Sequence, residues 1–224
     1  MTFITTACIW TANLTRAIDL LNRQNVDLVL ITGDFVTHKI NDDDAQSLRD
    51  NLSAIKSPDG VFAVPGNHDH WTDIGGVRDI LAMCDIVDLS NTVFTVERDG
   101  KLLNIAGVDD YWEQFADIDS VINQLPDTTS PTILMAHEPD YADISAATGR
   151  FDVQLSGHSH GGQVRLPLLG SPILPRFSRK YPAGQYQVEN MIQYTNRGLG
   201  VVMLPLRINC PPEITVFTLR TGKH

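Results

Sequence analysis

The chain has 224 residues, a formal net charge of −10 and a hydrophobic content of 42%, with a sequence pI near 5.0. Its length and composition are those of an ordinary globular protein that can bury a sizeable core without disulfides or structural metals. The acidic charge argues against a broad nucleic-acid-binding surface. No apolar run approaches the roughly 20 residues that a membrane-spanning helix needs.

The cysteines and the first residues bear on the cellular compartment. Cys8, Cys84 and Cys210 are odd in number, far apart in the sequence and outside any C-x-x-C motif, which argues against a disulfide framework. The segment 1–10 lacks the basic start of a signal peptide. We therefore expect a reducing, cytoplasmic location, while membrane association stays open because an upstream anchor would not be visible in this sequence.

The first half of the chain predicts helices that alternate with buried strands. Leu14, Ala17, Ile18 and Leu21 follow the spacing of one helix face, with Asn13 as the N-cap. The following elements come next: an apolar strand at 26–32, a helix that opens at 41–44 with acidic residues, a strand at 61–64 and a helix at 76–83.

The second half has a different order of predicted elements. It predicts a hairpin at 92–97 and 102–108, a helix at 118–125, strands at 132–136 and 151–155 with a helix at 141–147 between them, and strand-like segments at 186–194 and 213–220. This order favours one mixed α/β domain, residues 1–224, with two sheets packed face to face and helices outside them.

Polar residues follow the strands at the points where the strands end. Asp34, Asn67 and His137 each come after one strand, and His158 and His160 come after another, within the sequence GHSHGGQ. Taken singly, each is more often a turn residue or a structural histidine. The carboxyl ends of strands are, however, where α/β sheets build their sites. Together, these residues indicate one crevice lined by a carboxylate, an amide and imidazoles.

This mixture also indicates the kind of metal. Oxygen and imidazole ligands without clustered cysteines suit Mn, Fe, Zn, Co or Ni rather than structural zinc or an iron–sulfur cluster. Ligands that are spread over the whole chain suggest a catalytic site built into a fold, and not a small domain that folds around its metal.

Four motifs, in this order, resemble those of the calcineurin-like metallophosphoesterase superfamily: GD at 33–34, GNHD at 66–69, His137 and GHSH at 157–160. Together with the tail at 196–213, they look like the bacterial phosphodiesterase branch, which includes membrane-associated enzymes and relatives of UDP-diacylglucosamine hydrolases. The similarity runs over nearly the whole chain from about Leu14. It implies a four-layer α/β/β/α sandwich of two mixed sheets, and a hydrolase that cleaves phosphate mono- or diesters at two metals.

The resemblance also implies the ligands. Asp34 would bridge both metals, while Asn67, His137 and His158 would complete metal site two. His160 would bind metal site one.

The implied chemistry is physically sound. Two cations ~3.5–4 Å apart polarise phosphoryl oxygens and generate hydroxide near neutral pH, and a short bridging carboxylate such as Asp34 can hold them that close. His68 would be the general acid for the leaving alkoxide, or would hydrogen-bond the phosphate. An imidazole suits the first role because it titrates near neutral pH.

The sequence departs from the family at one motif. The family has an Asp-x-His at the end of the first strand, which supplies the other two ligands of metal site one. Here that register falls near Thr2 and Ile4, and the segment 1–12 contains no Asp, Glu or His. Metal site one is left with Asp34 and His160, too few ligands to hold a catalytic metal well.

Two explanations are open for this departure. In the first, the chain starts late or wrongly, so that the single domain lacks its native first strand; we favour this explanation because the other motifs look undamaged. Alternatively, the protein is a natural variant with one metal or none. The segment 1–10 has some strand character and could stand in for the first strand.

Further candidates each have a functional and a structural interpretation. His70 would line the substrate mouth or belong to a surface loop, and Arg197 would contact a phosphate or only brace the last strands. For Asp109 and Asp110 a turn or helix cap is the favoured interpretation. Glu138 would support the neighbouring ligand or start a helix.

The segment 161–183 is basic in an otherwise acidic chain. It has no acid and carries Arg165, Arg176, Arg179 and Lys180 among several large apolar residues. It is either a rim that attracts a phosphate, such as an anionic lipid headgroup at a membrane surface, or a proline-stiffened loop that packs its own small core. The two alternatives are about even.

Together, these observations predict a bacterial metal-dependent hydrolase of phosphate esters, most specifically a phosphodiesterase with a dinuclear metal centre. The alternative is a catalytically impaired relative, with one metal or none, that only binds phosphate ligands.

Overall fold

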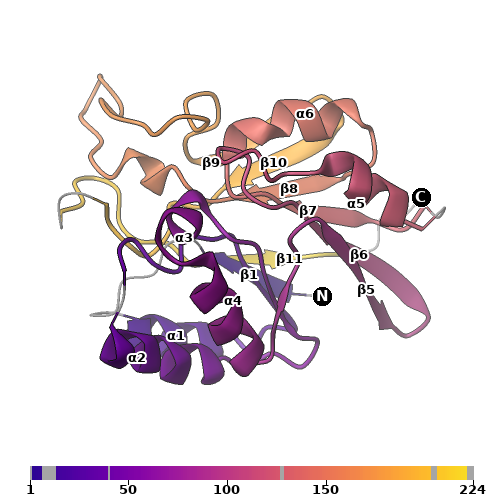
Figure 1. Cartoon of the computed structure of the whole chain (residues 1–224). Helices are drawn as coiled ribbons and strands as arrows, with labels where there is room; N and C mark the ends of the chain where they lie inside the picture. The colour runs from indigo at the N-terminus through magenta and orange to yellow at the C-terminus, as the bar shows by residue number, and fades with distance from the viewer. Residues whose placement is uncertain (1, 7–13, 40, 127–128, 203–205, 221–224) are drawn as a thin grey trace.

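The computed structural model describes residues 2–6, 14–39, 41–126, 129–202 and 206–220. Two sheets lie face to face, with helices on both outer faces (Figure 1). Three separate clusters of buried apolar side chains fill the space between one sheet and its helices, between the two sheets, and between the other sheet and its helices. The fold is therefore the predicted four-layer α/β/β/α sandwich.

The first sheet has the strand order β11-β1-β2-β3-β4 in the described part of the chain. Four strands run parallel, and β11 is antiparallel to β1. Their bounds are β1 Thr2–Thr6, β2 Leu28–Ile31, β3 Val61–Ala63, β4 Ile86–Asp88 and β11 Thr215–Thr218.

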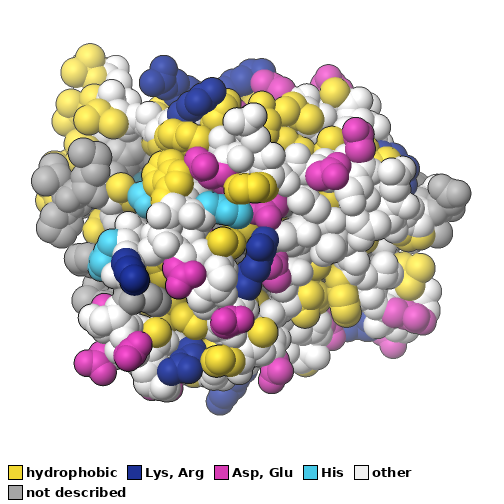
Figure 2. Space-filling view, in the orientation of Figure 1, with side chains coloured by type: hydrophobic (Ala, Val, Ile, Leu, Met, Phe, Trp, Pro, Cys, Tyr) yellow, Lys and Arg dark blue, Asp and Glu magenta, His cyan; other side chains and the backbone are white. Residues whose placement is uncertain are grey.

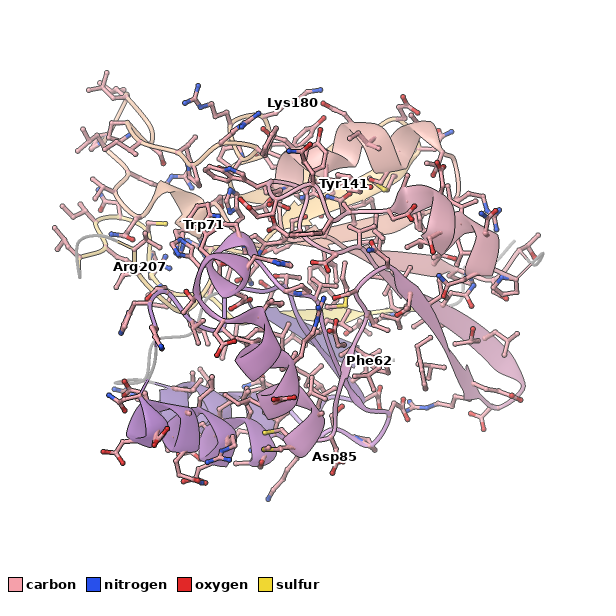
Figure 3. The ribbon with its side chains drawn as sticks, in the orientation of Figure 1. Phe62, Trp71, Asp85, Tyr141, Lys180 and Arg207 are labelled. Atoms are coloured by element: carbon pink, nitrogen blue, oxygen red, sulfur yellow. The ribbon has the colours of Figure 1, made fainter. Side chains whose placement is uncertain are left out.

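Strand β2 shows why the sequence there is continuously apolar. Leu28 and Leu30 belong to the cluster between the two sheets, as does Phe62 of β3 (labelled in Figure 3). Val29 and Ile31 belong to the cluster under the helices. Successive side chains of a strand point to opposite faces, so both faces of β2 are buried, as predicted.

Helices α1 Leu14–Asn22, α2 Asp42–Ser53 and α4 Ile74–Met83 cover the outer face of this sheet (Figure 1). Helix α1 buries Leu14, Ile18 and Leu21, as the spacing predicted. Helix α2 begins where the side chain of Asn41 accepts the backbone N–H of Asp44 at 2.9 Å, and acidic residues in its first turn complement the helix dipole.

The second sheet has the order β5-β6-β7-β8-β10-β9 among the described residues. Its inner strands are parallel, and its two edge strands, β5 and β9, are antiparallel to their neighbours. The bounds are β5 Thr92–Arg98, β6 Lys101–Gly107, β7 Thr132–Met135, β8 Val153–Ser156, β9 Gly184–Val188 and β10 Met191–Thr195, with α5 Ile118–Gln124 and α6 Ala142–Ala147 on the outer face.

Strand β1 occupies the central position that the sequence left in doubt. It pairs with β2 on one side and with β11 on the other, which confirms the strand character of the first ten residues for Thr2–Thr6. Residues 7–13, including the expected N-cap Asn13, lie outside the described residues. The explanation that the domain lacks its native first strand stays a prediction. No helix within the described residues is long and apolar enough to cross a membrane.

Candidate metal centre

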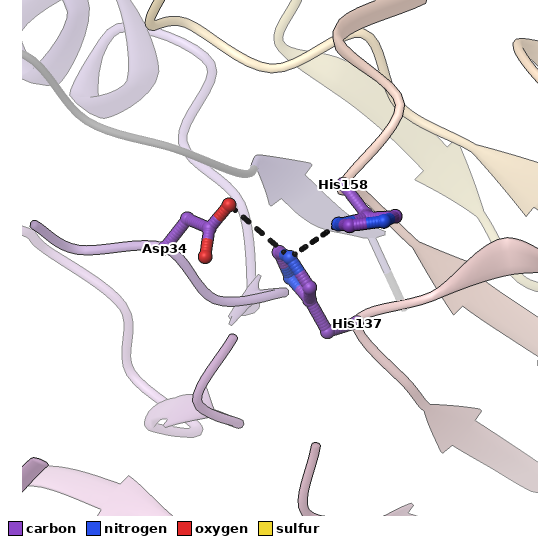
Figure 4. Close-up of side chains that lie close together, drawn as sticks. All are labelled: Asp34, His137 and His158. Atoms are coloured by element: carbon purple, nitrogen blue, oxygen red, sulfur yellow. Dashed lines mark hydrogen bonds and ion pairs between the residues drawn. The ribbon is translucent and has the colours of Figure 1, made fainter. Parts of the chain in front are cut away.

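Three side chains from both sheets converge at the carboxyl ends of β2, β7 and β8. The Nε2 atom of His137 lies 3.2 Å from Oδ2 of Asp34 and 3.1 Å from Nδ1 of His158 (Figure 4). All three residues are buried, and each offers a ligand atom within 4.8 Å of those of the other two. The structure thus brings together three of the five predicted metal ligands as one group.

Backbone carbonyls fix the tautomers of both histidines. Nδ1 of His137 lies 2.6 Å from the carbonyl oxygen of Thr32, and Nε2 of His158 lies 2.7 Å from that of Arg176. A carbonyl only accepts, so each of these ring nitrogens carries the proton and donates it. With both imidazoles neutral, Nε2 of His137 and Nδ1 of His158 offer two lone pairs beside a carboxylate oxygen, which is the arrangement that a metal cation satisfies. Without a cation, the Asp34 carboxylate favours a proton on Nε2 of His137.

The electrostatics of the group agree with this arrangement. Burial and the neighbouring His137 charge lower the pKa of His158 to about 3. Burial also disfavours charge on His137, but the facing Asp34 carboxylate outweighs it and raises the pKa of His137 to about 10. The pKa of Asp34 is held below its usual range by His137, although burial alone would raise it. The pocket is therefore built to hold positive charge between these side chains.

Asn67 and His160 are the other two predicted ligands. Both are buried, and Oδ1 of Asn67 and Nδ1 of His160 have no hydrogen-bond partner among the described residues. Buried polar atoms without a partner are rare in native structures. Together with Asp34, His137 and His158, these residue types make a donor set of oxygen and nitrogen that fits a divalent transition metal. His160 lies outside the close group of three.

Asp69 holds the ligand-bearing backbone in place. Its carboxylate accepts the N–H groups of Asp34 and Gly66, both at 2.9 Å, and that of Val36 at 3.1 Å. Asp34 sits at φ 59°, a strained conformation for a non-glycine residue, and its own Oδ1 accepts the N–H of His68 at 3.0 Å. We assigned no role to Asp69 from the sequence, although its position three residues after Gly66 is that of a capping box.

The same capping arrangement starts helix α3, Asn67–Thr72, which the sequence analysis did not predict. The GNHD motif is therefore a helix start, and not only a turn after a strand. His68 is part-buried on this helix, and its ring lies 4.9 Å from that of Trp71 (Figure 3). Its role as a general acid stays a prediction.

Glu138 and Trp112 are neighbours of two candidate ligands: Glu138 follows His137 in the sequence, and Trp112 packs against His158. Glu138 is fully buried, and its two carboxylate oxygens accept the N–H groups of Tyr111 and Trp112, each at 3.1 Å. The ring of Trp112 lies edge-on, 5.7 Å from the ring of His158. Glu138 is also the N-cap residue of the short 3-10 helix Pro139–Tyr141, so the helix-start interpretation holds, while support of the neighbouring ligand stays a prediction. Asp110 accepts the N–H of Glu113 at 2.7 Å, which is the turn that we favoured for it.

His70 does not belong to a surface loop. It lies on α3, and its side chain is only 8% exposed because it is packed in two directions. Its Nε2 is 2.7 Å from Oδ1 of Asp109, and its ring stacks on Phe115 at 4.7 Å. Asp109 also pairs with Arg78 at 2.9 Å. A role of His70 in substrate binding stays a prediction.

Replacing His70 by glutamine is expected to destabilise the protein more at about pH 5.5 than at about pH 9. Burial alone would lower the pKa of His70, but Asp109 outweighs it and raises the value. The resulting stabilisation is complete below the unfolded-state pKa and is lost as the pH rises through the folded-state pKa. We expect a difference of about 1 kcal/mol between the two pH values, measured by urea unfolding. Equal losses at both, or the same pattern in the exposed His38→Gln control, would contradict this.

Two arginines near the chain end behave differently from one another. Arg197 pairs with Glu213 through its Nε, which agrees with the bracing interpretation; phosphate contact stays a prediction. Arg207 (labelled in Figure 3) was not singled out from the sequence. It donates to backbone carbonyl oxygens of the following residues: His160, Arg197, Gly198, Gly200 and Cys210.

Replacing Arg207 by methionine is expected to lower the free energy of unfolding by about 2–3 kcal/mol, because several part-buried carbonyls lose a charged donor at once. Lysine should recover only part of this loss, since a single ammonium group does not reproduce the guanidinium fork. Chemical denaturation measures both variants beside the exposed Arg16→Met. The three variants unfolding alike would refute the role of Arg207.

The comparisons with known proteins agree with this site. The family model described as calcineurin-like phosphoesterase matches residues 9–162. The chain is 34% identical over 203 residues to the uncharacterized metallophosphoesterase YkuE of Bacillus subtilis, covering 90% of this chain and 70% of that one. It is 30% identical over 206 residues to phosphodiesterase YaeI of Escherichia coli, covering 91% and 74%.

Solved structures share the fold. A novel archaeal phosphodiesterase matches with a TM-score of 0.54 at 15% identity, over 97% of this chain and 93% of that one. The protein TT1561 of Thermus thermophilus matches with a TM-score of 0.58 at 12% identity, over 88% and 89%.

The family match and the relatives define a metallophosphoesterase. The chain belongs to the calcineurin-like phosphoesterase family, whose members are metal-dependent hydrolases of phosphate esters.

Proposed function

We propose that this chain is a phosphodiesterase that works with divalent transition metals. The observation that carries the proposal is the convergence of Nε2 of His137, Nδ1 of His158 and Oδ2 of Asp34, with the opposite nitrogen of each ring held by a backbone carbonyl. Family membership supports phosphate-ester hydrolysis. The similarity to phosphodiesterase YaeI supports a diester as the substrate.

Metal site two would be held by Asp34, Asn67, His137 and His158. Asp34 would also reach metal site one, to which His160 contributes. The buried, unpartnered Nδ1 of His160 supports its part in a dinuclear centre. When bound, such metals polarise phosphoryl oxygens and lower the pKa of water.

The side chains around the ligands have separate tasks. His68, fixed by its backbone N–H on Asp34, would give a proton to the leaving alkoxide. Asp69 holds the strained Asp34 backbone, so the carboxylate does not need to reorganise during the reaction. Trp112 packs against His158 with its ring nearly perpendicular, and would exclude water from that side.

A second candidate function is binding without turnover, by a centre with a single metal or none. The observation that favours it is the absence of Asp, Glu and His from residues 1–12, where the family's remaining ligands of metal site one would be expected.

Metal content and turnover together separate the two candidates. The purified chain is loaded with Mn²⁺, the metal per chain is measured by elemental analysis, and hydrolysis of bis(p-nitrophenyl) phosphate is followed. Two metals with turnover support the dinuclear phosphodiesterase. One metal with turnover keeps the phosphodiesterase but removes the dinuclear centre. One metal or none without turnover supports the second candidate.

Metal removal gives a readout that is independent of activity. Chelation with EDTA is expected to lower the melting temperature, and added Mn²⁺ should restore it, because a ligand that binds only the folded state stabilises that state. Differential scanning fluorimetry measures this shift. An unchanged melting temperature in the presence of excess Mn²⁺ would count against metal binding by the described pocket.

A further inference from the structure

A loop of large apolar side chains projects from the molecule beside the metal centre. We call residues 164–177 the apolar loop; it is the orange segment at the upper left of Figure 1. Leu168, Leu169 and Ile173 are 106%, 79% and 76% exposed. Figure 2 shows hydrophobic side chains gathered at this edge. Such exposure at a convex tip means that these side chains pack on nothing, so the tip does not form a small core of its own.

Hydrogen bonds nevertheless give the apolar loop a defined shape. Leu166 and Gly170 exchange backbone hydrogen bonds of 2.8 and 3.0 Å, which close the turn that carries Leu168 and Leu169. At its base, Val164 bridges to Ile208, and Oγ of Ser171 donates to the carbonyl of Gly161 at 3.0 Å. The apolar tip is therefore presented on a built support.

Three arginines lie within the apolar loop or directly after it. Arg165, Arg176 and Arg179 are exposed, and residues 161–183 contain no acid although the whole chain carries a net charge of −10. Lys180 is neutralised by Asp143 at 2.6 Å. Lys and Arg side chains line the top of the molecule next to the hydrophobic edge (Figure 2). The surface thus combines protruding apolar side chains with an adjacent positive rim.

We propose that the apolar loop docks on the surface of a bilayer that contains anionic phospholipid. Leu168, Leu169 and Ile173 would enter the boundary between headgroups and acyl chains, and the arginines would contact lipid phosphates. A bilayer fits better than a protein groove for two reasons. A convex tip with no flat surround offers little complementary area to a folded partner, whereas a fluid surface adapts to it. The positive rim also matches anionic headgroups.

Docking would position the metal centre. The apolar loop begins shortly after His160 in the sequence. At its far end, the carbonyl oxygen of Arg176 accepts a hydrogen bond from Nε2 of His158 at 2.7 Å. The far end of the apolar loop is therefore tied to a candidate ligand.

Vesicle binding tests the docking without any use of turnover. Full-length protein is sedimented with vesicles of phosphatidylcholine alone, or of phosphatidylcholine mixed with phosphatidylglycerol. We expect binding to the mixed vesicles that weakens with salt. Combined serine substitution of Leu168, Leu169 and Ile173 should reduce the partition coefficient at least about tenfold. Arg165→Gln and Arg179→Gln should each reduce it about fivefold.

Two control variants separate docking from folding and from general surface hydrophobicity. Leu168→Ser alone changes a side chain with no contacts to lose, so it should weaken binding without affecting folding, which circular dichroism verifies. Met83→Ser, at a 64% exposed apolar residue of α4, should bind like the unmodified protein. No binding to mixed vesicles, or equal binding by the triple-serine variant, overturns the proposal. So does association of the protein with itself through these leucines in the absence of vesicle binding. Activity on bis(p-nitrophenyl) phosphate reports separately on the proposed function.

Discussion

Replacing Asp34 by asparagine is expected to abolish metal loading and to lower diester turnover by on the order of 10³-fold or more. The amide keeps the size of the side chain but removes its negative charge, which faces His137 at 3.2 Å. It can also turn its NH₂ group toward the metal position, and that group has no lone pair to offer a metal. Elemental analysis of the Mn²⁺-loaded protein and hydrolysis of bis(p-nitrophenyl) phosphate measure the two effects.

The matched control is Asp79→Asn, which removes one carboxylate from an exposed position on α4. It has the same effect on net charge, so metal content and turnover should stay at the level of the unmodified protein. Metal content that survives in Asp34→Asn at the level of this control would remove Asp34 from the ligand set. The proposed bridging role would fall with it.

The layers of the fold could be predicted because they depend on local patterns. The apolar run of β2 and the 3.6-residue spacing of α1 each require burial on particular faces, and neighbouring residues alone set these patterns. Strand β1 was harder to predict, since its place depends on pairing with β11 from the opposite end of the chain. Helix α3 escaped prediction because its six residues contain no apolar repeat, and its start depends on the capping by Asp69.

The candidate site divides in the same way. The residue types that gather at the strand ends were visible in the sequence, and the structure brings Asp34, His137 and His158 together. The carbonyls that fix the tautomers were not visible, because Thr32 and Arg176 contribute through their backbones, whatever their side chains are. The backbone carbonyls that accept hydrogen bonds from Arg207 were not visible in the sequence for the same reason. Contacts of this kind depend on where distant loops pass, and no sequence motif marks them.

Replacing Gly66 by alanine is expected to disrupt the metal centre with only a moderate loss of stability. A methyl group there would lie 2.6 Å from Cε1 and 2.7 Å from Nδ1 of His137, and would also overlap Oδ1 of Asp34. The backbone of Gly66 is extended, at φ −123° and ψ 175°, so alanine can adopt it, and the whole effect comes from these contacts. We expect metal affinity to fall by about 10²-fold or more and the free energy of unfolding by about 1–3 kcal/mol.

Gly75→Ala is the matched control, because it adds the same methyl group nearby in the chain. Its nearest neighbour would be Oδ1 of Asp73 at an ordinary 3.6 Å, and the position lies within α4. Alanine there should stabilise the protein by about 0.5–1 kcal/mol and leave metal affinity unchanged. Titration calorimetry with Mn²⁺ and urea unfolding separate the two variants. If Gly66→Ala bound metal as tightly as Gly75→Ala, then Asp34 and His137 could not both be ligands in the arrangement described, since the methyl group must displace one of them.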